Sequence, residues 1–253
     1  MMAGIYYSIS PSILEQYRLW KTGVYQRMGK DSDDLVEYIK GDYKPNIYTS
    51  RGNAYGAMIE HGPDKYTMSF DHPQVDELFE AINKPDSDGI PTVGKYFFYD
   101  KEFGKLWAFT DEEVEPIRKI RQDFPHMAYE VRASLSFKNM GPVPVWVGMR
   151  LDGMFGLGLH EFKTTSKPKM YQDREESLQA KCYLTAFKDA QSITYHDCLF
   201  HQSPRRVTND RKVIGNDPLC WAEVESWTSE LIAWMKVKPE LIAVRTRKSK
   251  FDG

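Results

Sequence analysis

The sequence VWVGMRLDGMFGLGLHEFKTT, at residues 145–165, contains two strand patterns separated by glycines. Residues 145–149 are apolar and partly β-branched, which is typical of a buried strand. Residues 157–165 alternate between two sets of side chains, which indicates a second strand. The glycine-rich GMFGLG between them predicts a tight turn. The two strands are therefore expected to form a hairpin, with Asp152 at the end of the first strand.

Three charged side chains of this hairpin can meet at one place. The turn can bring Asp152 beside Glu161, and Lys163 shares a face with Glu161 because successive strand residues point to opposite faces. Phe162 points the other way and can pack against a core. Paired carboxylates hold Mg²⁺ or Mn²⁺, ions that are completed by water and substrate phosphates. Such an ion polarises a phosphate, and a lysine can orient the attacking water, so these residues indicate phosphodiester hydrolysis.

The spacing of Asp152, Glu161 and Lys163 is by itself a weak signal. Each residue type makes up about 6% of an average chain, so such a set occurs by chance about once in a protein of this length. The alternative is an ordinary surface salt bridge on a hairpin. The context favours a site, because Glu161 and Lys163 stand among apolar strand residues where unpaired charges would be costly.

The amino-acid composition limits the classes of protein to which this chain can belong. The chain has 253 residues, of which 41% are hydrophobic, so it can bury one sizeable core, and a single domain is expected. The net charge of −2 gives no global basic field of the kind found in many nucleic-acid-binding domains. Any contact with DNA must therefore come from a local basic patch.

The cysteines and the apolar segments indicate the cellular compartment in which the protein is expected. The three cysteines, Cys182, Cys198 and Cys220, are odd in number and unevenly spaced, which favours reduced thiols over a disulfide framework or a zinc ribbon. The start, MMAGIYYSIS, lacks a charged segment followed by an apolar core, and no run approaches the ~18 apolar residues of a membrane span. A cytoplasmic protein with no membrane partner is expected.

The first predicted helix begins near residue 11. Ser10 is a good N-cap, Pro11 suits the first helical position, and apolar residues then recur at helical spacing. Arg18 lies off the apolar stripe and could reach a phosphate, but surface statistics favour a solvated arginine. The stretch 23–50 is polar, and Tyr43, Pro45 and Asn46 indicate a loop within it.

A second helix is predicted over residues 49–60, with Gly52 and Gly56 on one face. Each glycine costs a helix about 1 kcal/mol relative to alanine, which suggests close approach by another backbone or by a phosphate. Tight helix packing is the alternative. Glu60 lies one turn beyond Gly56 and faces the same way.

Later elements follow from periodicity. The patterns predict helices over 111–124, 175–190 and 222–237, and strands over 128–137 and 192–199. Gln179 and Tyr183 are four residues apart and share a helix face. The densest basic segment, residues 203–206, is expected to be a loop that either contacts phosphate or is simply solvated. The basic tail, residues 245–253, is expected to be frayed and to contact DNA nonspecifically or not at all.

Together these elements resemble the PD-(D/E)XK nuclease superfamily, in particular its RecB-like branch and the phage recombination exonucleases related to lambda exonuclease. The resemblance covers about residues 8–190, and its elements occur in the expected order. The residues that carry it are SPSIL at 10–14, RGNAYG at 51–56, LDG at 151–153, EFKTT at 161–165 and QAKCY at 179–183.

The resemblance implies an α/β fold with a central mixed β-sheet flanked by helices, a restriction-endonuclease-like core. It implies Mg²⁺ (or Mn²⁺) bound at Asp152, Glu161 and Phe162, with Lys163 assisting the attacking water. Gln179 and Tyr183 would line the site and help to place the scissile strand. Residues expected to contact DNA are Ser12, Arg18, Arg51, Arg205 and Arg206.

The main departure from the family is at position 56. The family offers a His or Glu to the metal there, and this chain has Gly56. Glu60, one turn later, is the candidate replacement, whereas His61 points about 100° away. The chain also lacks the cysteine cluster of the iron–sulfur members of the family.

The resulting expectation is one nuclease-like domain over residues 1–253, with a helical N-terminal part (8–125), a catalytic core (126–240) and a basic tail (241–253). The expected activity is a metal-dependent DNA exonuclease that resects double-stranded ends for phage-type recombination or repair. By analogy, a ring-like homo-oligomer and a single-strand annealing protein are expected partners. The alternatives are a structure-specific or site-specific endonuclease and a catalytically impaired module that binds DNA or docks a partner.

Overall fold

A mixed β-sheet forms the centre of the computed structural model, which describes residues 5–42, 46–69, 71–82, 94–138, 140–166 and 174–248. The sheet has seven strands in the order β8-β7-β6-β5-β1-β9, and β4 also pairs with β5. The β1–β5 and β6–β7 pairs are parallel and the others are antiparallel. The strands are β1 Ile5–Ile9, β4 Ala128–Phe137, β5 Val145–Phe155, β6 Gly158–Thr165, β7 Ser192–Gln202, β8 Arg205–Gly215 and β9 Thr246–Lys248. The predicted fold class, a central mixed sheet flanked by helices, is confirmed.

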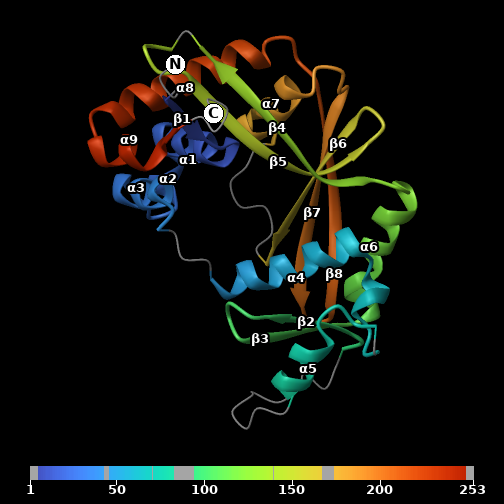
Figure 1. Ribbon diagram of the computed structural model, residues 1–253. Helices are drawn as coiled ribbons and strands as arrows, with labels where there is room; N and C mark the ends of the chain where they lie inside the picture. The colour runs from blue at the N-terminus through green and yellow to red at the C-terminus, as the bar shows by residue number, and fades with distance from the viewer. Residues whose placement is uncertain are drawn as a thin grey trace.

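One face of the sheet is covered by helices from both ends of the chain (Figure 1). Alternate residues of β5 (Val145, Val147, Met149 and Leu151) are buried on this face and form the larger core, as the period of two in a strand requires. The helices on this side are α1 Pro11–Lys21, α2 Val24–Arg27, α3 Ser32–Lys40, α7 Leu178–Ala186, α8 Cys220–Lys236 and α9 Pro239–Arg245.

The opposite face is covered over β6–β8. Along β7, Ile193 and Tyr195 belong to the first core, whereas Cys198 and Phe200 point the other way into a second core. Figure 1 shows α4 crossing this part of the sheet, with the β2–β3 hairpin beyond it. The remaining elements are α4 Ile47–His61, η1 Pro63–Tyr66, α5 Val75–Ile82, β2 Tyr96–Asp100, β3 Lys105–Phe109, α6 Asp111–Asp123 and η2 Arg174–Glu176.

The pleat of β4 is interrupted at Glu130. Tyr129 packs against the second core and Val131 against the first, and Glu130 between them has φ +54°. The flanking pairs Tyr129↔Gly153 and Val131↔Leu151 are both formed, so the interruption lies opposite Asp152. A positive φ is uncommon for a residue other than glycine, and such strain tends to occur at functional sites.

Several local predictions are confirmed. Ser10 caps α1 and its side chain accepts from the Ile13 N–H, and Pro11 occupies the first helical position. The strand over 128–137 has the predicted bounds, and α6, α7, β7 and α8 overlap the predicted elements. All three cysteines are free and buried, as expected for reduced thiols. Among the described residues, no helix has the length and apolar character needed to cross a membrane.

The structure differs from the local predictions in two places. The polar stretch 23–50 contains α2 and α3, which were not predicted, and residues 43–45 of the predicted loop lie outside the described part of the chain. Helix α3 was missed because only Leu35 and Ile39 are buried, too few to give a clear stripe, although Asp31 forms a capping box. Strand β5 runs through Asp152 to Phe155, so Asp152 lies inside the strand rather than at its end.

The predicted frayed tail is wrong where it is described. Helix α9 ends at Arg245, and residues 246–248 form β9, which pairs antiparallel with β1. These residues are therefore part of the sheet edge. The rest of the tail, residues 249–253, lies outside the described residues. The β2–β3 hairpin was also not predicted, and it lies within the part of the chain expected to be helical.

The two glycines of α4 have different surroundings, although both were expected to permit close approach. A Cβ on Gly52 would lie 2.5 Å from Thr164 Oγ1 of β6, whereas a Cβ on Gly56 would meet nothing within 4 Å. Close packing against β6 therefore explains why position 52 is a glycine, but it does not explain the glycine at position 56. Gly56 faces a cavity instead.

We predict opposite effects of alanine at these two positions. Gly56→Ala should raise the free energy of unfolding by about 0.5–1 kcal/mol, because it adds helix propensity without a clash. Gly52→Ala should lower it by about 1 kcal/mol or more, because Thr164 is branched at Cβ and has few alternative rotamers. Urea unfolding measures both changes, and equal stabilisation of the two variants would contradict the packing described for Gly52.

Candidate functional site

The site lies where β5 changes neighbours. Strand β1 pairs with β5 as far as Val147, and β6 begins to pair with it at Gly153. Within the described residues, the edge of β5 between these points has no strand partner on that side. Tyr183 of α7 fills part of the gap, because its hydroxyl donates to the Arg150 carbonyl over 2.9 Å. The sheet is thus open beside Asp152.

The five residues predicted to form the catalytic set lie together around this opening. The Phe162 N–H donates to Asp152 Oδ2 over 2.8 Å, which places β5 beside β6. Lys163 Nζ lies 2.5 Å from Glu161 Oε1, and Gln179 Nε2 donates to the same oxygen over 3.0 Å. Tyr183 Oη accepts from Gln179 Nε2 over 3.3 Å.

Glu161 is buried and Asp152 is half-buried. Glu161 is 2% exposed, and burial raises the pKa of Glu161 to about 7, with Lys163 opposing the shift and Asp152 adding to it. Burial also raises the pKa of Asp152 above its ordinary value, again against the attraction of Lys163. The two acids thus share the attraction of one amine, that of Lys163. This arrangement favours either a proton or an additional cation.

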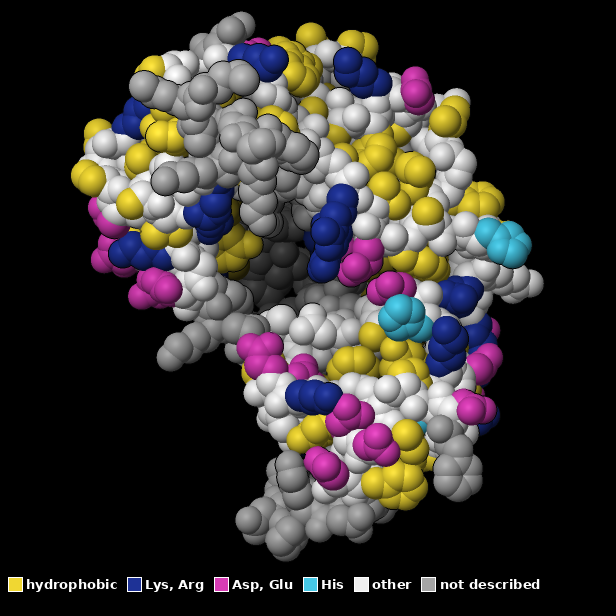
Figure 2. Space-filling view, in the orientation of Figure 1, with side chains coloured by type: hydrophobic (Ala, Val, Ile, Leu, Met, Phe, Trp, Pro, Cys, Tyr) yellow, Lys and Arg dark blue, Asp and Glu magenta, His cyan; other side chains and the backbone are white. Residues whose placement is uncertain are grey.

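Two cavities meet at Asp152. The first, of about 500 Å³, is lined by Ser12, Glu161, Gln179 and Tyr183 among others. The second, of about 650 Å³, lies between α4 and the strands and is lined by residues that include Gly56, Glu60 and Lys163. Asp152 and Arg150 line both cavities. In Figure 2 this face of the molecule is hollowed between the upper helices and the part that carries α4, with Lys and Arg side chains on the border.

The donor set fits a hard divalent cation at an open site. Glu161 Oε2 is buried and has no hydrogen-bond partner, which is costly unless a cation or a proton satisfies it. Among the described residues, no group of three or more His, Cys, Asp or Glu side chains is arranged to hold a metal. A cation held by Asp152 and Glu161 would therefore take most of its ligands from water or substrate, as Mg²⁺ commonly does.

The positions of the other two predicted metal ligands, Phe162 and Glu60, do not directly indicate contact with a cation. The Phe162 side chain packs in the second core against the His196 ring, so only its main-chain carbonyl could reach a cation. Glu60 lines the second cavity together with Asp152, whereas Glu161 lines the first. The Glu60 carboxylate lies 3.9 Å from His61 Nε2. The role of Glu60 as a ligand stays a prediction.

Arg18 has a structural partner, so the expectation of a solvated arginine is wrong. Its guanidinium is 2.7 Å from Glu15 Oε1 and 3.4 Å from Glu176 Oε2, and the residue is only 7% exposed. Glu15 Oε2 also accepts from the Leu178 N–H over 2.7 Å. This buried ion pair ties α1 to the start of α7, the helix that carries Gln179.

The other arginines expected to contact DNA are mostly engaged within the protein. Arg51 and Arg205 both bind the fully buried Glu113, at 2.8 Å and 2.7 Å, and Arg51 stacks over the Phe200 ring at 4.0 Å. They therefore link α4 and β8 to α6. The predicted basic loop at 203–206 is a turn followed by β8, which already begins at Arg205. Arg206 on that strand is exposed.

Three charged residues of the site were not predicted. Arg132 and Arg150 are cross-strand partners on β4 and β5, and both line the first cavity with Asp152. Glu130 lines the second cavity and pairs with Arg150 at 3.2 Å. The available signal was the alternation in β4 and β5, which places these side chains opposite the buried apolar residues.

Comparisons with known proteins give only remote similarities. No protein-family model and no curated protein matches the sequence. A crystal structure from Eubacterium rectale, of a protein called "Putative exonuclease", is similar over 97% of this chain and 85% of its own, with a TM-score of 0.43 and 12% identity. A protein named SSO0001 is similar over 47% of this chain and 55% of its own, with a TM-score of 0.36 and 18% identity. This chain thus matches about half the length of SSO0001. Neither similarity is high enough to support a functional argument.

We predict that Arg18 contributes to stability. Arg18→Met should lower the free energy of unfolding by about 3 kcal/mol, because it leaves the Glu15 carboxylate buried without its cation. Arg206→Ala, on an exposed arginine, should change it by no more than about 0.5 kcal/mol. Urea unfolding of both variants tests this, and an Arg18→Met protein as stable as Arg206→Ala would show that the pair contributes nothing.

Proposed function

We propose that this protein is a metal-dependent DNA nuclease with the restriction-endonuclease-like core of the PD-(D/E)XK superfamily. The preferred activity is an exonuclease that resects double-stranded ends for recombination or repair. The observation that carries the proposal is the meeting of Asp152, Glu161 and Lys163 where two open cavities join, with Glu161 Oε2 buried and unpartnered. A structural salt bridge would not explain that oxygen.

The residues divide into binding and positioning roles. Asp152 and Glu161 would hold Mg²⁺ or Mn²⁺, which supplies polarisation of the phosphate and acidification of a bound water. Lys163 Nζ borders the cavity, where it can donate a hydrogen bond to an attacking water or to a phosphate oxygen. Gln179 orients the Glu161 carboxylate, and Tyr183 holds Gln179 and the β5 edge in place.

A second candidate function is a module that binds DNA but is catalytically impaired. Gly56 faces open space at the position where the family offers a metal ligand, which favours this alternative. Against it stand the complete Asp152, Glu161 and Lys163 set and the acidic side chain of Glu60 on the same cavity. An endonuclease on the same core is a third form of the activity. The cytoplasmic location, the homo-oligomer and the single-strand annealing partner are proposals by analogy.

Linear and covalently closed circular DNA distinguish the nuclease modes. With Mg²⁺, the wild-type protein should degrade linear duplex and leave the closed circle intact, because an exonuclease requires an end. Asp152→Asn and Lys163→Ala should each lower the rate by about 100-fold or more, since each removes a group that acts on the reacting phosphate. Cleavage of the circle would indicate an endonuclease, and full activity in both variants would rule out this site.

Metal binding can be measured without any substrate. Saturating Mn²⁺ should raise the unfolding temperature of the wild type, with a gain of about 2.7 kcal/mol at roughly 100 times the dissociation constant. Glu161→Gln should remove this gain while keeping the side-chain shape. Glu60→Gln should weaken it if Glu60 is a ligand, and an unchanged Mn²⁺ titration would exclude Glu60. A Glu161→Gln protein that Mn²⁺ still stabilises normally would place the cation elsewhere.

A further inference from the structure

One part of the sheet has an exposed face beside the proposed site. Residues 146, 148 and 150 of β5 point away from the first core and are exposed. The helix α4 and the β2–β3 hairpin cover this side over β6–β8, and the cover extends to Tyr129 at the start of β4. The exposed part therefore comprises residues 132–136 of β4 and 146–150 of β5, together with the same side of β1 and β9. We call this surface the open face.

The open face carries an exposed aromatic pair. Trp146 is 43% exposed, and its ring lies 5.6 Å from the Tyr6 ring on β1. The cross-strand neighbours of Trp146 are Ser8 and Ser136, so small polar side chains surround the indole. An exposed tryptophan whose neighbours on both adjacent strands are serines is a poor centre for a protein interface, but it is a suitable platform on which a base can stack.

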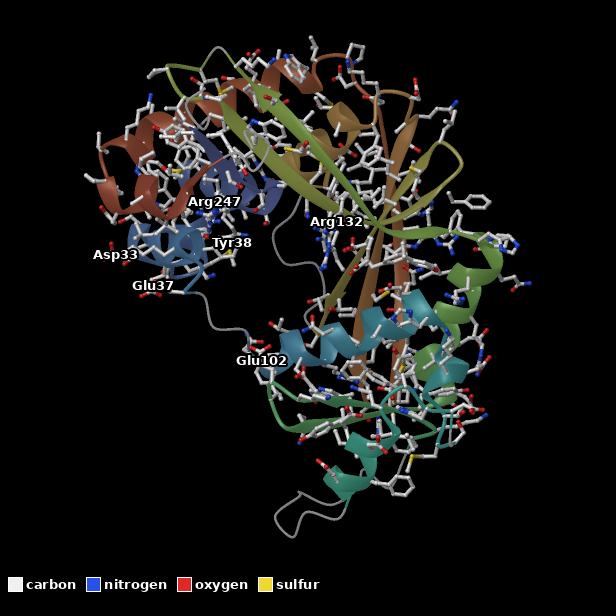
Figure 3. All side chains as sticks on the ribbon, in the orientation of Figure 1. Asp33, Glu37, Tyr38, Glu102, Arg132 and Arg247 are labelled. Atoms are coloured by element: carbon white, nitrogen blue, oxygen red, sulfur yellow. The ribbon has the colours of Figure 1, made fainter. Side chains whose placement is uncertain are left out.

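Arginines lie on both sides of this aromatic pair. Arg247 of β9 is the cross-strand partner of Tyr6, and Arg132 of β4 is the partner of Arg150. Figure 3 labels Arg132 near the centre of the view and Arg247 to its left, near Tyr38. Arg150 is paired with Glu130, whereas within the described residues neither Arg132 nor Arg247 forms an ion pair. Arg247 Nη1 donates to the Val244 and Thr246 carbonyls over 2.7 and 3.0 Å. Both arginines are exposed, so Arg132 and the remaining N–H groups of Arg247 can face an anion.

Gly148 leaves the space between Trp146 and Arg150 empty. A Cβ at Gly148 would meet nothing within 4 Å, and Gly148 lines the same cavity as Arg132, Asp152 and Glu161. At about 3.3 Å per strand residue, Trp146 lies about 20 Å from Asp152 along β5. The open face thus forms a continuous, basic and partly aromatic path that ends at the two carboxylates.

We propose that the open face binds single-stranded DNA leading to or from the proposed nuclease site. Trp146 stacks on a base, Arg132 and Arg247 contact phosphates, and the strand passes over Gly148 toward Asp152. Single-stranded DNA is the fitting occupant, because stacking requires an unpaired base and the arginines complement the phosphate charge. The inference rests on the proposed function for its direction, but the binding itself requires no hydrolysis.

Fluorescence anisotropy with a short fluorescein-labelled oligodeoxythymidine, in EDTA to prevent hydrolysis, measures this binding. Trp146→Ala should weaken affinity by about 10-fold, and Trp146→Phe should restore most of it, because stacking needs only an aromatic face. Trp221→Ala is the matched control, since Trp221 is 41% exposed and its ring contacts Phe137, which is buried in the first core on the other side of the sheet. Equal losses in the two alanine variants, or none in Trp146→Ala, would overturn the proposal.

Salt dependence tests the arginines. Each phosphate contact to a single strand contributes about 0.7 to the slope of log affinity against log salt concentration. Arg132→Gln and Arg247→Gln should therefore each reduce the magnitude of that slope by about 0.7. Unchanged slopes in both variants would show that the phosphates lie elsewhere.

A side chain added at Gly148 tests the path directly. Gly148→Val should weaken oligonucleotide binding by more than about 10-fold without loss of stability, because valine suits a strand and has free space there. Gly215→Val is the matched control, as Gly215 ends β8 and also has nothing within 4 Å of a Cβ. Normal binding by the Gly148→Val protein would overturn the proposal.

The outcomes separate this inference from the proposed function. If Mg²⁺-dependent hydrolysis is found but Trp146→Ala and Gly148→Val bind the oligonucleotide normally, only the open face is wrong. If no hydrolysis is found but binding depends on Trp146 and Gly148, the open face binds DNA and the nuclease assignment is wrong.

Discussion

The placement of two carboxylates, one buried and one half-buried, beside one lysine is the constraint on which the site depends. Asp152 and Glu161 lie at the junction of β5 and β6, and the cation that faces both is Lys163. Buried charges are costly unless they are paired, and Glu161 Oε2 is left without a partner. The unpaired oxygen at this junction therefore lowers the free energy of unfolding. A divalent cation would recover it and would at the same time create a hydrolytic centre.

The sheet is open beside Asp152 because β5 pairs with three different strands along its length. It pairs with β4 along most of its length, with β1 at its start and with β6 near its end. Between the segments of β5 that pair with β1 and with β6, α7 supplies a hydrogen bond that a strand would otherwise provide. It runs from the Tyr183 hydroxyl to the Arg150 carbonyl. The buried Arg18–Glu15 pair and the Leu178 N–H hold α1 against the start of α7. The larger core thus positions the side chains of the site.

The arginines show how partners far apart in the chain change the role of a residue. Arg51 and Arg205 bind Glu113, which is 62 and 92 residues away from them in the sequence. From the sequence, both resembled exposed phosphate contacts. In the structure they satisfy a carboxylate that has no access to water. Arg132 and Arg247, which are exposed, lie instead on the strands β4 and β9 of the open face.

Local patterns were sufficient for the elements whose signals lie close together in the chain. The Ser10 cap, the alternation over residues 128–137 and the order of Asp152, Glu161, Lys163, Gln179 and Tyr183 all depend on spacing within a strand or helix. These patterns carry the resemblance to the nuclease superfamily, and it is that resemblance which implied the fold class and the full set of residues that meet. The tertiary structure decided the rest: the pairing of β9 with β1, the different surroundings of Gly52 and Gly56, and the exposure of Trp146. The physical reason is that burial, ion pairing and strand order depend on contacts between residues distant in sequence, which periodicity does not encode.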